Sequence, residues 1–274
     1  VPIGQSDISL TAIDKWENVK TEIIKLERTY NKNRHLKSPK EGLNPTLLIG
    51  KKNQNRQALI LGVNSYETLT DLPFAENDAN FFHDYAVNTL GIPAENIIRV
   101  INPELKDMYK STNNLQKMID EHSELFVYYA GHGLNYQSDN RLLAADFDVS
   151  VIQQTSLLQS EFIDMIAKAN PRSVTIIFDT CFSGINRDGE QLVDARFVSI
   201  AESTINLPNN FIVISSSGKL EWSRDHPEQN HGLFTYHFLK GLEKKADINN
   251  DKQITLSELF SYVQKNVQQD SNYQ

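Results

Sequence analysis

The sequence is poor in cysteine and lacks long apolar runs, and each shortage excludes a class of protein. Its 274 residues include one cysteine, Cys181, so no disulfide forms within the chain and the redox compartment stays undecided. No apolar run approaches the roughly 18 residues that a membrane-spanning helix needs. We therefore expect a protein without membrane contact, and we place it in the cytoplasm.

The chain also begins without methionine and without the pattern of a signal peptide. The opening Val1-Pro-Ile-Gly4 lacks the charged and apolar regions of a secretory signal. We therefore expect a processed or trimmed piece of a longer product. Its length is enough for one large α/β domain with an appendage.

Charge is unevenly distributed along the chain, whose formal net charge is −8. Residues 1–56 carry 11 Lys and Arg against 6 Asp and Glu, whereas the remainder carries 16 against 29. The acidic bulk suits a basic peptide substrate and argues against direct binding of nucleic acid. The basic leader is either solvated, packed against its own acidic domain, or available to an anionic partner.

Strand-like and helix-like patterns alternate from residue 57 onward. Short β-branched runs predict strands, and amphipathic periodicity predicts the helices between them. Such alternation is typical of a mostly parallel sheet covered by helices on both faces. The expected strands are 57–63, 96–101, 125–130, 174–179 and 211–215, and the expected helices are 76–90, 112–121, 159–169, 233–244 and 256–268.

The first 56 residues are expected to form an appendage to a main domain at 57–274. Thr11 and Asp14 are typical of a helix start, and apolar residues follow at steps of three and four up to Tyr30. A polar linker with proline and glycine comes next. This pattern predicts an amphipathic helix that either docks on the main domain or contacts a regulatory protein partner or a second copy.

Two of the predicted strands end in residues that carry reactive chemistry. His132 follows the strand that ends at Ala130, and Cys181 follows the strand that ends at Asp179. Ligands of open α/β sheets bind beyond the carboxyl ends of strands, so the two side chains share one rim if the strands are neighbours. Imidazole then accepts the thiol proton, and the thiolate attacks a carbonyl carbon. Backbone N–H groups of Gly133 and Cys181 would hold the resulting oxyanion.

The same residues carry a family resemblance. Tyr129-Ala-Gly-His-Gly133 and Asp179-Thr-Cys-Phe-Ser-Gly184, in that order and spacing, resemble caspase-like cysteine peptidases of the metacaspase and bacterial caspase-homologue branch. The resemblance extends from about residue 57 to residue 266. It implies a caspase-like three-layer α/β/α sandwich with a mostly parallel sheet. It also implies Cys181 as the nucleophile and His132 as the base.

Acidic residues near the expected nucleophile indicate the charge of the substrate. Asp179 lies two residues before Cys181 and so shares its face along a strand. A carboxylate there pairs with a basic side chain, bidentately with Arg, and repels an acidic one. The resemblance to metacaspases likewise implies cleavage after Arg or Lys, with Asp78 as a second pocket acid. Asp78 is equally typical of a helix N-terminus, where it complements the dipole.

Two further segments are candidates for contact with a peptide. The last expected strand ends in Ser215, Ser216 and Ser217, whose backbone would pair with an extended substrate as an added strand. The loop before that strand is long for a compact domain. Related enzymes are often cut there during activation, and the resemblance implies that this chain can be cut there too. If the pocket prefers basic residues, Arg187 and Arg196 are the candidate self-cleavage sites. An ordinary surface loop is the competing interpretation.

A last motif, residues 247–258, has the spacing of an EF-hand loop. Position six holds Lys252 instead of the usual glycine, and its ammonium would repel a cation. Bound Ca²⁺ is one interpretation of this loop, and a capped helix–turn–helix without a metal is the other. We expect that the protein requires no cofactor. The candidate ligands are Asp247, Asn249, Asp251, Gln253 and Glu258.

Two other functions compete with a cysteine endopeptidase. One is a non-catalytic caspase-fold scaffold that binds partners through the N-terminal segment, since a lone His or Cys is more often a buried structural residue. The other is a sensor in which calcium at residues 247–258 regulates activity. The combination of His132 and Cys181 favours the peptidase, activated by a partner or by self-cleavage, because a scaffold does not need the pair.

Overall fold

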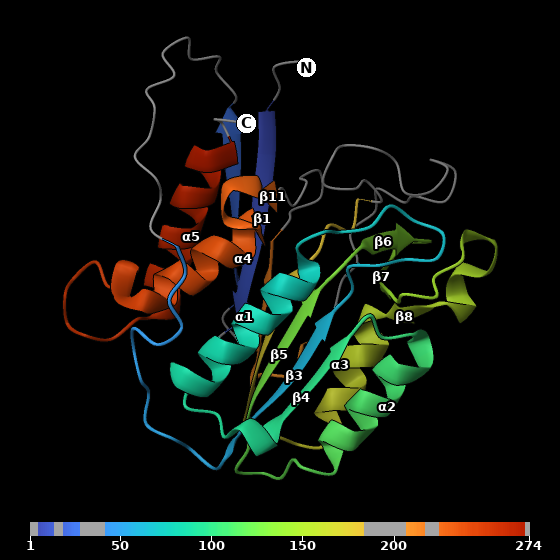
Figure 1. Cartoon of the computed structure of the whole chain (residues 1–274), viewed down its shortest axis with the longest axis horizontal. Coiled ribbons are helices and arrows are strands. Elements are labelled where there is room, and N and C mark those ends of the chain that lie inside the picture. Colours follow the sequence, from blue (N-terminus) through green and yellow to red (C-terminus); the bar gives the residue numbers. More distant parts are fainter. Residues whose placement is uncertain (1–4, 14–18, 28–41, 184–206, 217–224, 272–274) are drawn as a thin grey trace.

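The chain is folded around a parallel sheet of five strands, in the order β10-β9-β5-β3-β4 (Figure 1). A computed structural model describes residues 5–13, 19–27, 42–183, 207–216 and 225–271. All four pairings within the sheet are parallel, as the alternation of strands and helices predicts. The strands are β3 (Arg56–Gly62), β4 (Ile97–Ile101), β5 (Glu124–Ala130), β9 (Ser173–Asp179) and β10 (Phe211–Ser215).

Helices cover both faces of this sheet. The helices are α1 (Ala75–Asn88), α2 (Leu105–Gln116), α3 (Gln159–Ala167), α4 (Leu233–Lys240) and α5 (Leu256–Ser271). Figure 1 shows α2 and α3 packed together on one face, whereas α1, α4 and α5 lie on the other. The expected three-layer α/β/α sandwich is confirmed. None of the helices in the described ranges has the length and apolar character needed to cross a bilayer.

Shorter elements connect these layers. The short helices are η1 (Ala94–Asn96), η2 (Val149–Gln154) and η4 (Pro227–Gln229). A π-helical turn, η5 (Gly241–Lys245), follows α4. The short strands are β6 (Gly133–Tyr136), β7 (Asp139–Leu143), β8 (Ser156–Leu158), β11 (Asp225–His226) and β12 (His231–Gly232). The first three form a small antiparallel sheet between β5 and α3, a region where no strands were predicted from the sequence.

The central strands are buried on both faces because helices cover both faces. In β3, Leu59, Ile60 and Leu61 are all fully buried, although successive side chains point to opposite faces. This double burial explains why β3, β5 and β9 have continuous apolar sequences without alternation. The edge strand β4 is only partly buried.

One helix begins earlier than its sequence suggests. α2 was expected over 112–121, but it extends from Leu105 to Gln116. Its start is held by Asp146, whose Oδ1 accepts a hydrogen bond from the Leu105 N–H at 2.9 Å. Thr112, a residue typical of helix starts, instead lies inside the helix, where its hydroxyl donates to the Met108 carbonyl oxygen at 2.8 Å.

The prediction of an amphipathic helix over residues 11–33 is wrong. The chain instead forms two antiparallel strands, β1 (Gln5–Ile13) and β2 (Val19–Glu27), and β1 lies alongside β10 at the edge of the central sheet. Ile8 and Leu10 alternate with polar residues, and this period of two is typical of a strand. The later apolar residues, at steps of three and four, are typical of a helix, so the sequence pattern fits both structures. The predicted partner-binding helix is therefore replaced by a hairpin, while the domain division after residue 56 stays a prediction.

Candidate active site

The two strands that carry the sequence motifs are neighbours at the centre of the sheet. β5 and β9 pair in parallel, and their last residues, Ala130 and Asp179, are register partners. Beyond that point the Gly131 N–H donates to the carbonyl oxygen of Asp179 at 3.3 Å. His132 and Cys181 therefore follow the carboxyl ends of adjacent strands, at one rim of the sheet. The sequence interpretation depended on β5 and β9 being neighbours, and this adjacency is confirmed.

The imidazole of His132 is oriented by a backbone carbonyl. Its Nε2 lies 2.8 Å from the carbonyl oxygen of Thr70, and the side chain is buried. Because a carbonyl oxygen only accepts, Nε2 carries the proton in this bond, and Nδ1 of the neutral ring is then the proton acceptor. Thr70 was not predicted from the sequence, since a backbone carbonyl has no side-chain signature.

Two tyrosines hold the backbone of His132. The Tyr66 hydroxyl accepts from the His132 N–H at 2.7 Å, and the Tyr66 and His132 rings lie 4.7 Å apart. The Tyr129 hydroxyl donates to the His132 carbonyl oxygen at 2.7 Å. Burial raises the pKa of Tyr129 well above its usual value, so this hydroxyl stays protonated. Glycine is required at Gly131, because a Cβ there would lie 2.6 Å from the Tyr129 hydroxyl oxygen.

Cys181 lies in a loop that packs closely against the His132 segment. Its side chain is 8% exposed, and its Sγ lies 2.8 Å from the hydroxyl oxygen of Ser183. A Cβ at Gly133 would lie 2.6 Å from the Thr180 Oγ1, so glycine permits this approach. The N–H groups of Gly133 and Cys181 stay predicted oxyanion donors.

The small sheet braces the same loop. Leu134 of β6 forms a β-bridge with Ser183, and the Asn135 N–H donates to the Phe182 carbonyl oxygen at 2.8 Å. The segments that follow β5 and β9 are thus joined by backbone hydrogen bonds on both sides of Cys181. This connection restricts how far the thiol and the imidazole segments move apart.

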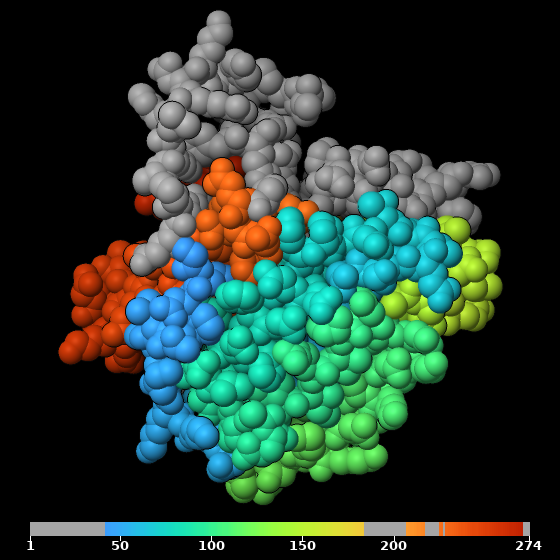
Figure 2. All heavy atoms as spheres, in the orientation of Figure 1, coloured from blue at the N-terminus to red at the C-terminus, as the bar shows by residue number. Residues whose placement is uncertain are grey.

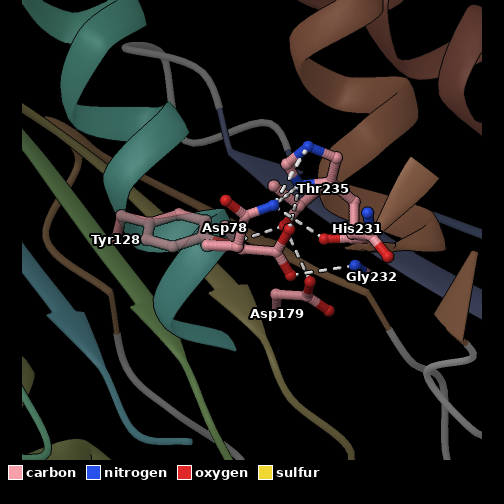
Figure 3. A network of polar contacts seen from close by, with 8 residues as sticks. Asp78, Tyr128, Asp179, His231, Gly232 and Thr235 are labelled. Atoms are coloured by element: carbon pink, nitrogen blue, oxygen red, sulfur yellow. Dashed lines mark hydrogen bonds and ion pairs between the residues drawn. The ribbon is translucent and has the colours of Figure 1, made fainter. Parts of the chain in front are cut away.

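Asp179 is fully buried in a polar network, shown in Figure 3. Its Oδ2 accepts a hydrogen bond from the Thr235 hydroxyl at 2.7 Å. The Thr235 Oγ1 also lies 2.6 Å from the hydroxyl oxygen of Tyr128. Asp179 thus comes from β9, Tyr128 from β5 and Thr235 from the first turn of α4. Sequence analysis assigned no role to Tyr128 or Thr235, which are far from Asp179 along the chain.

Asp78, the second acid predicted for the pocket, is also fully buried. It lies in the first turn of α1, where the sequence interpretation also placed a dipole-complementing acid. Its Oδ1 pairs with His231 Nδ1 at 2.7 Å, and its Oδ2 accepts from the Gly232 N–H at 2.9 Å. Both carboxylate oxygens therefore contact the residues that precede α4, and a role in substrate binding stays a prediction.

The end of β10 lies beside β9. The Ser216 N–H donates to the Phe178 carbonyl oxygen at 2.9 Å, and the Ser216 hydroxyl donates to the Thr180 carbonyl oxygen at 3.3 Å. Ser215 and Ser216 border a hollow of about 480 Å³, including space open to solvent. Phe238 of α4 is one of the apolar side chains that line it. The predicted roles of Ser217, Arg187 and Arg196 concern positions outside the described residues.

The EF-hand-like loop is held by its own hydrogen bonds. Asp247 accepts from the backbone N–H groups of Asp251 (3.1 Å) and Lys252 (3.0 Å), and Glu258 accepts from the Thr255 N–H at 2.9 Å. Lys252 has a φ of +68°, the left-handed conformation that glycine usually adopts. Within the described ranges, no three His, Cys, Asp or Glu side chains gather as a metal site. Calcium binding at this loop stays a prediction, which calorimetric titration tests.

Comparison with known proteins agrees with the fold and the motifs. The sequence profile of the caspase domain family matches residues 55–274. The chain is 25% identical over 207 residues to the paracaspase of Dictyostelium discoideum, covering 74% of this chain and 48% of that protein. It is 26% identical over 172 residues to metacaspase-7 of Arabidopsis thaliana, covering 59% and 41% respectively. The chain therefore spans about half the length of these curated relatives, or less.

A solved structure is similar in fold. A crystal structure of a protein from Geobacter sulfurreducens matches with a TM-score of 0.54 and 15% sequence identity. The match covers 76% of this chain and 87% of that chain. At this identity the likeness concerns the fold alone, and it agrees with the α/β sandwich described above.

Proposed function

The chain belongs to the caspase domain family of cysteine peptidases, and on this premise we propose that it is an endopeptidase that cuts proteins after Arg or Lys. The observation that carries the proposal is the adjacency of β5 and β9, from whose ends His132 and Cys181 follow. Membership of this peptidase family supports proteins as the substrates.

In the proposed reaction the thiol of Cys181 gives its proton to Nδ1 of His132, and the thiolate attacks the peptide carbonyl carbon. The Thr70 carbonyl oxygen supports this role because it keeps the imidazole proton on Nε2. The N–H groups of Gly133 and Cys181 donate to the oxyanion. The imidazolium then protonates the leaving amine, and water hydrolyses the thioester to release the acid and restore the thiol.

Selection of a basic residue before the scissile bond is assigned to Asp179, helped by Asp78. Burial supports this assignment, because a buried carboxylate gains more from a cationic partner than an exposed one does. The backbone of Ser215 and Ser216, with Ser217, is proposed to bind the extended substrate as an added strand. The Ser216 hydroxyl contacts the carbonyl oxygen of Thr180, so the carboxyl end of β10 lies next to the residue that precedes Cys181.

Activation by a partner or by self-cleavage is part of the same proposal. A pocket that accepts a basic side chain would also accept Arg187 and Arg196 of the chain itself. We expect purified protein to be cut at one of these residues, and the Cys181→Ala variant to remain intact. Fragments of the Cys181→Ala variant at the same positions would contradict self-cleavage.

The test is hydrolysis of fluorogenic peptides that end in Arg or in Asp. We expect Arg peptides to be cleaved at least about 100-fold faster, since like charges placed together cost several kcal/mol. Cys181→Ala should abolish both activities. Faster cleavage after Asp would overturn the pocket assignment, and full activity of Cys181→Ala would overturn the nucleophile.

Alkylation separates the peptidase from a non-catalytic scaffold. Cys181 is the single cysteine of the chain, so every label from an iodoacetamide probe reports on this thiol. A thiolate activated by an imidazole reacts quickly near neutral pH, whereas an inert buried thiol does not. Slow labelling that His132→Ala leaves unchanged would favour the scaffold.

A further inference from the structure

The two acids assigned to the pocket contact one short segment at the start of α4, residues 231–235 (Figure 3). Asp78 binds the first two residues of this segment, and Asp179 binds the last, Thr235. In Figure 3 the labelled side chains of Asp78, Asp179 and Thr235 lie together between α1, α4 and the ends of the strands. This arrangement suggests that the segment transmits the position of one acid to the other.

The direction of the hydrogen bonds at Asp179 follows from their chemistry. A carboxylate only accepts, so the single hydroxyl proton of Thr235 is donated to Asp179. The Tyr128 hydroxyl, 2.6 Å from Thr235 Oγ1, must then donate to it. All three residues are buried, which strengthens such a chain of hydrogen bonds. Thr235 is therefore held in one orientation while it holds Asp179.

That orientation matters for the substrate proposed above. A guanidinium binds a carboxylate as a planar fork, so the plane of the carboxylate must be set correctly. An ammonium is a point charge and tolerates more rotation of its partner. The hydrogen bond from Thr235 should therefore contribute more to binding of Arg than to binding of Lys.

The start of α4 is itself fixed by α1. Asp78 pairs with His231 and accepts from the N–H of Gly232, which is the residue that caps α4. Next to Asp78, the Asn77 side-chain amide donates to the Asn230 carbonyl oxygen at 2.7 Å. Thr235 lies less than one helical turn beyond Gly232, so a shift of the helix start would move its hydroxyl.

We propose that Thr235 is a positioning residue for Asp179 in the pocket for basic side chains. Asp78 also fixes the start of α4, on which Thr235 lies. This proposal rests on the proposed function, because it concerns the same pocket. It specifies why this short segment of α4 matters for specificity.

Thr235→Val tests the positioning role, because valine keeps the shape of threonine and removes the hydroxyl. We expect the KM for an Arg peptide to rise about tenfold, the loss typical of a hydrogen bond to a charged group, with kcat little changed. The ratio of kcat/KM for Arg over Lys peptides should fall. Thr235→Ser, which keeps the hydroxyl, should behave like the wild type, and Tyr128→Phe should change KM in the same direction by less.

The outcomes distinguish this inference from the proposed function. A wild-type protein that does not cleave Arg peptides contradicts the proposed function before any variant is compared. A wild type that cleaves them, with Thr235→Val at unchanged KM, contradicts the positioning role alone. Rates are normalised to the fraction of Cys181 that an iodoacetamide probe labels. Should Thr235→Val not fold, Tyr128→Phe carries the same comparison, since it removes only the donor to Thr235.

Discussion

The sulfur of Cys181 has a hydroxyl partner two residues away, the Oγ of Ser183 at 2.8 Å. Once the thiol has lost its proton, sulfur only accepts, so Ser183 must donate. A hydrogen bond to the charged form favours that form. Ser183 also forms the β-bridge with Leu134, so its position is fixed by β6. At the scale of single residues, Ser183 of the motif therefore favours the thiolate form of Cys181.

Ser183→Ala should slow alkylation of Cys181 at neutral pH by about three- to tenfold, because the thiolate loses one donor. The rate is measured with iodoacetamide across a pH series, and its midpoint should move to higher pH. Ser183→Thr, which retains a hydroxyl, is the matched control. An unchanged pH profile in Ser183→Ala would show that the hydroxyl does not act on the sulfur.

At the scale of elements, a buried charge cluster joins the segment that precedes β3 to the C-terminal helices. Lys240 of α4 pairs with Glu243 of η5 at 2.7 Å and donates to the Gly42 carbonyl oxygen at 2.8 Å. Glu243 also accepts from the Asn44 N–H at 2.7 Å and from the Tyr85 hydroxyl. Figure 2 shows the residues after 42, in blue, against the orange and red C-terminal part.

Because the cluster is buried, each charged group in it needs its partner of opposite charge. Burial raises the pKa of Tyr85, with further contributions from its hydrogen bond to Glu243, so Tyr85 remains a neutral donor. Glu243→Ala would leave the Lys240 ammonium buried without its counter-charge. Such a loss typically costs about 3–5 kcal/mol, whereas an apolar replacement of both partners is often neutral.

We therefore expect Glu243→Ala to lower the free energy of unfolding by about 3–5 kcal/mol. The double variant Lys240→Met/Glu243→Leu should recover most of this loss. Urea unfolding followed by circular dichroism measures both. Equal destabilisation by the single and the double variant would show that packing, and not the unpaired charge, causes the loss.

The start of α5 depends on pH through a reciprocal cap. Glu258 accepts from the Thr255 N–H and hydroxyl, and its own N–H donates to Thr255 Oγ1. These hydrogen bonds, the backbone one first, lower the pKa of Glu258 below its usual 4.5. The stabilisation is therefore present above pH 4.5 and is lost as pH falls through the lowered value.

Glu258→Gln should lower the midpoint of thermal unfolding near neutral pH by a degree or so, roughly the effect of a single cap. The difference from the wild type should shrink toward zero as pH falls to about 3. Differential scanning calorimetry over this range measures it. The exposed Glu67 provides a control, since Glu67→Gln should leave the midpoint unchanged. A difference that does not depend on pH would rule out the carboxylate as its source.

At the scale of the whole molecule, residues 57–274 carry 16 Lys and Arg against 29 Asp and Glu. A protein with this excess of negative charge attracts a cationic peptide over distances longer than a hydrogen bond. Dissolved salt screens such attraction, with a Debye length of about 10 Å at 0.1 M. The overall charge should therefore affect how fast a basic substrate is captured.

We expect kcat/KM for an Arg peptide to fall about two- to tenfold when salt is raised from about 0.05 to 0.5 M. The decrease should be in kcat/KM and not in kcat, because screening acts on encounter. Alkylation of Cys181 by neutral iodoacetamide should not change over the same range. A salt-independent kcat/KM would show that the net charge has no part in capture.

Much of the fold could be predicted from the sequence because its signals are local. Continuous apolar runs predict β3, β5 and β9, and their short alternation with amphipathic segments predicts the parallel sheet. The N-terminal hairpin could not be predicted in the same way. Its apolar residues fit both a strand and a helix, and pairing between β1 and β2 decides between them.

The amino-acid sequence by itself determined the candidate groups for the chemistry, His132 and Cys181, because those residue types follow two strands in a recognisable order. Only the tertiary structure decided that these strands are neighbours. It also decided which groups orient the side chains of His132 and Asp179. The Thr70 carbonyl has no side-chain signature, and Thr235 lies 56 residues from the Asp179 that it contacts. Such partners are brought together by packing of distant segments, which no local pattern records.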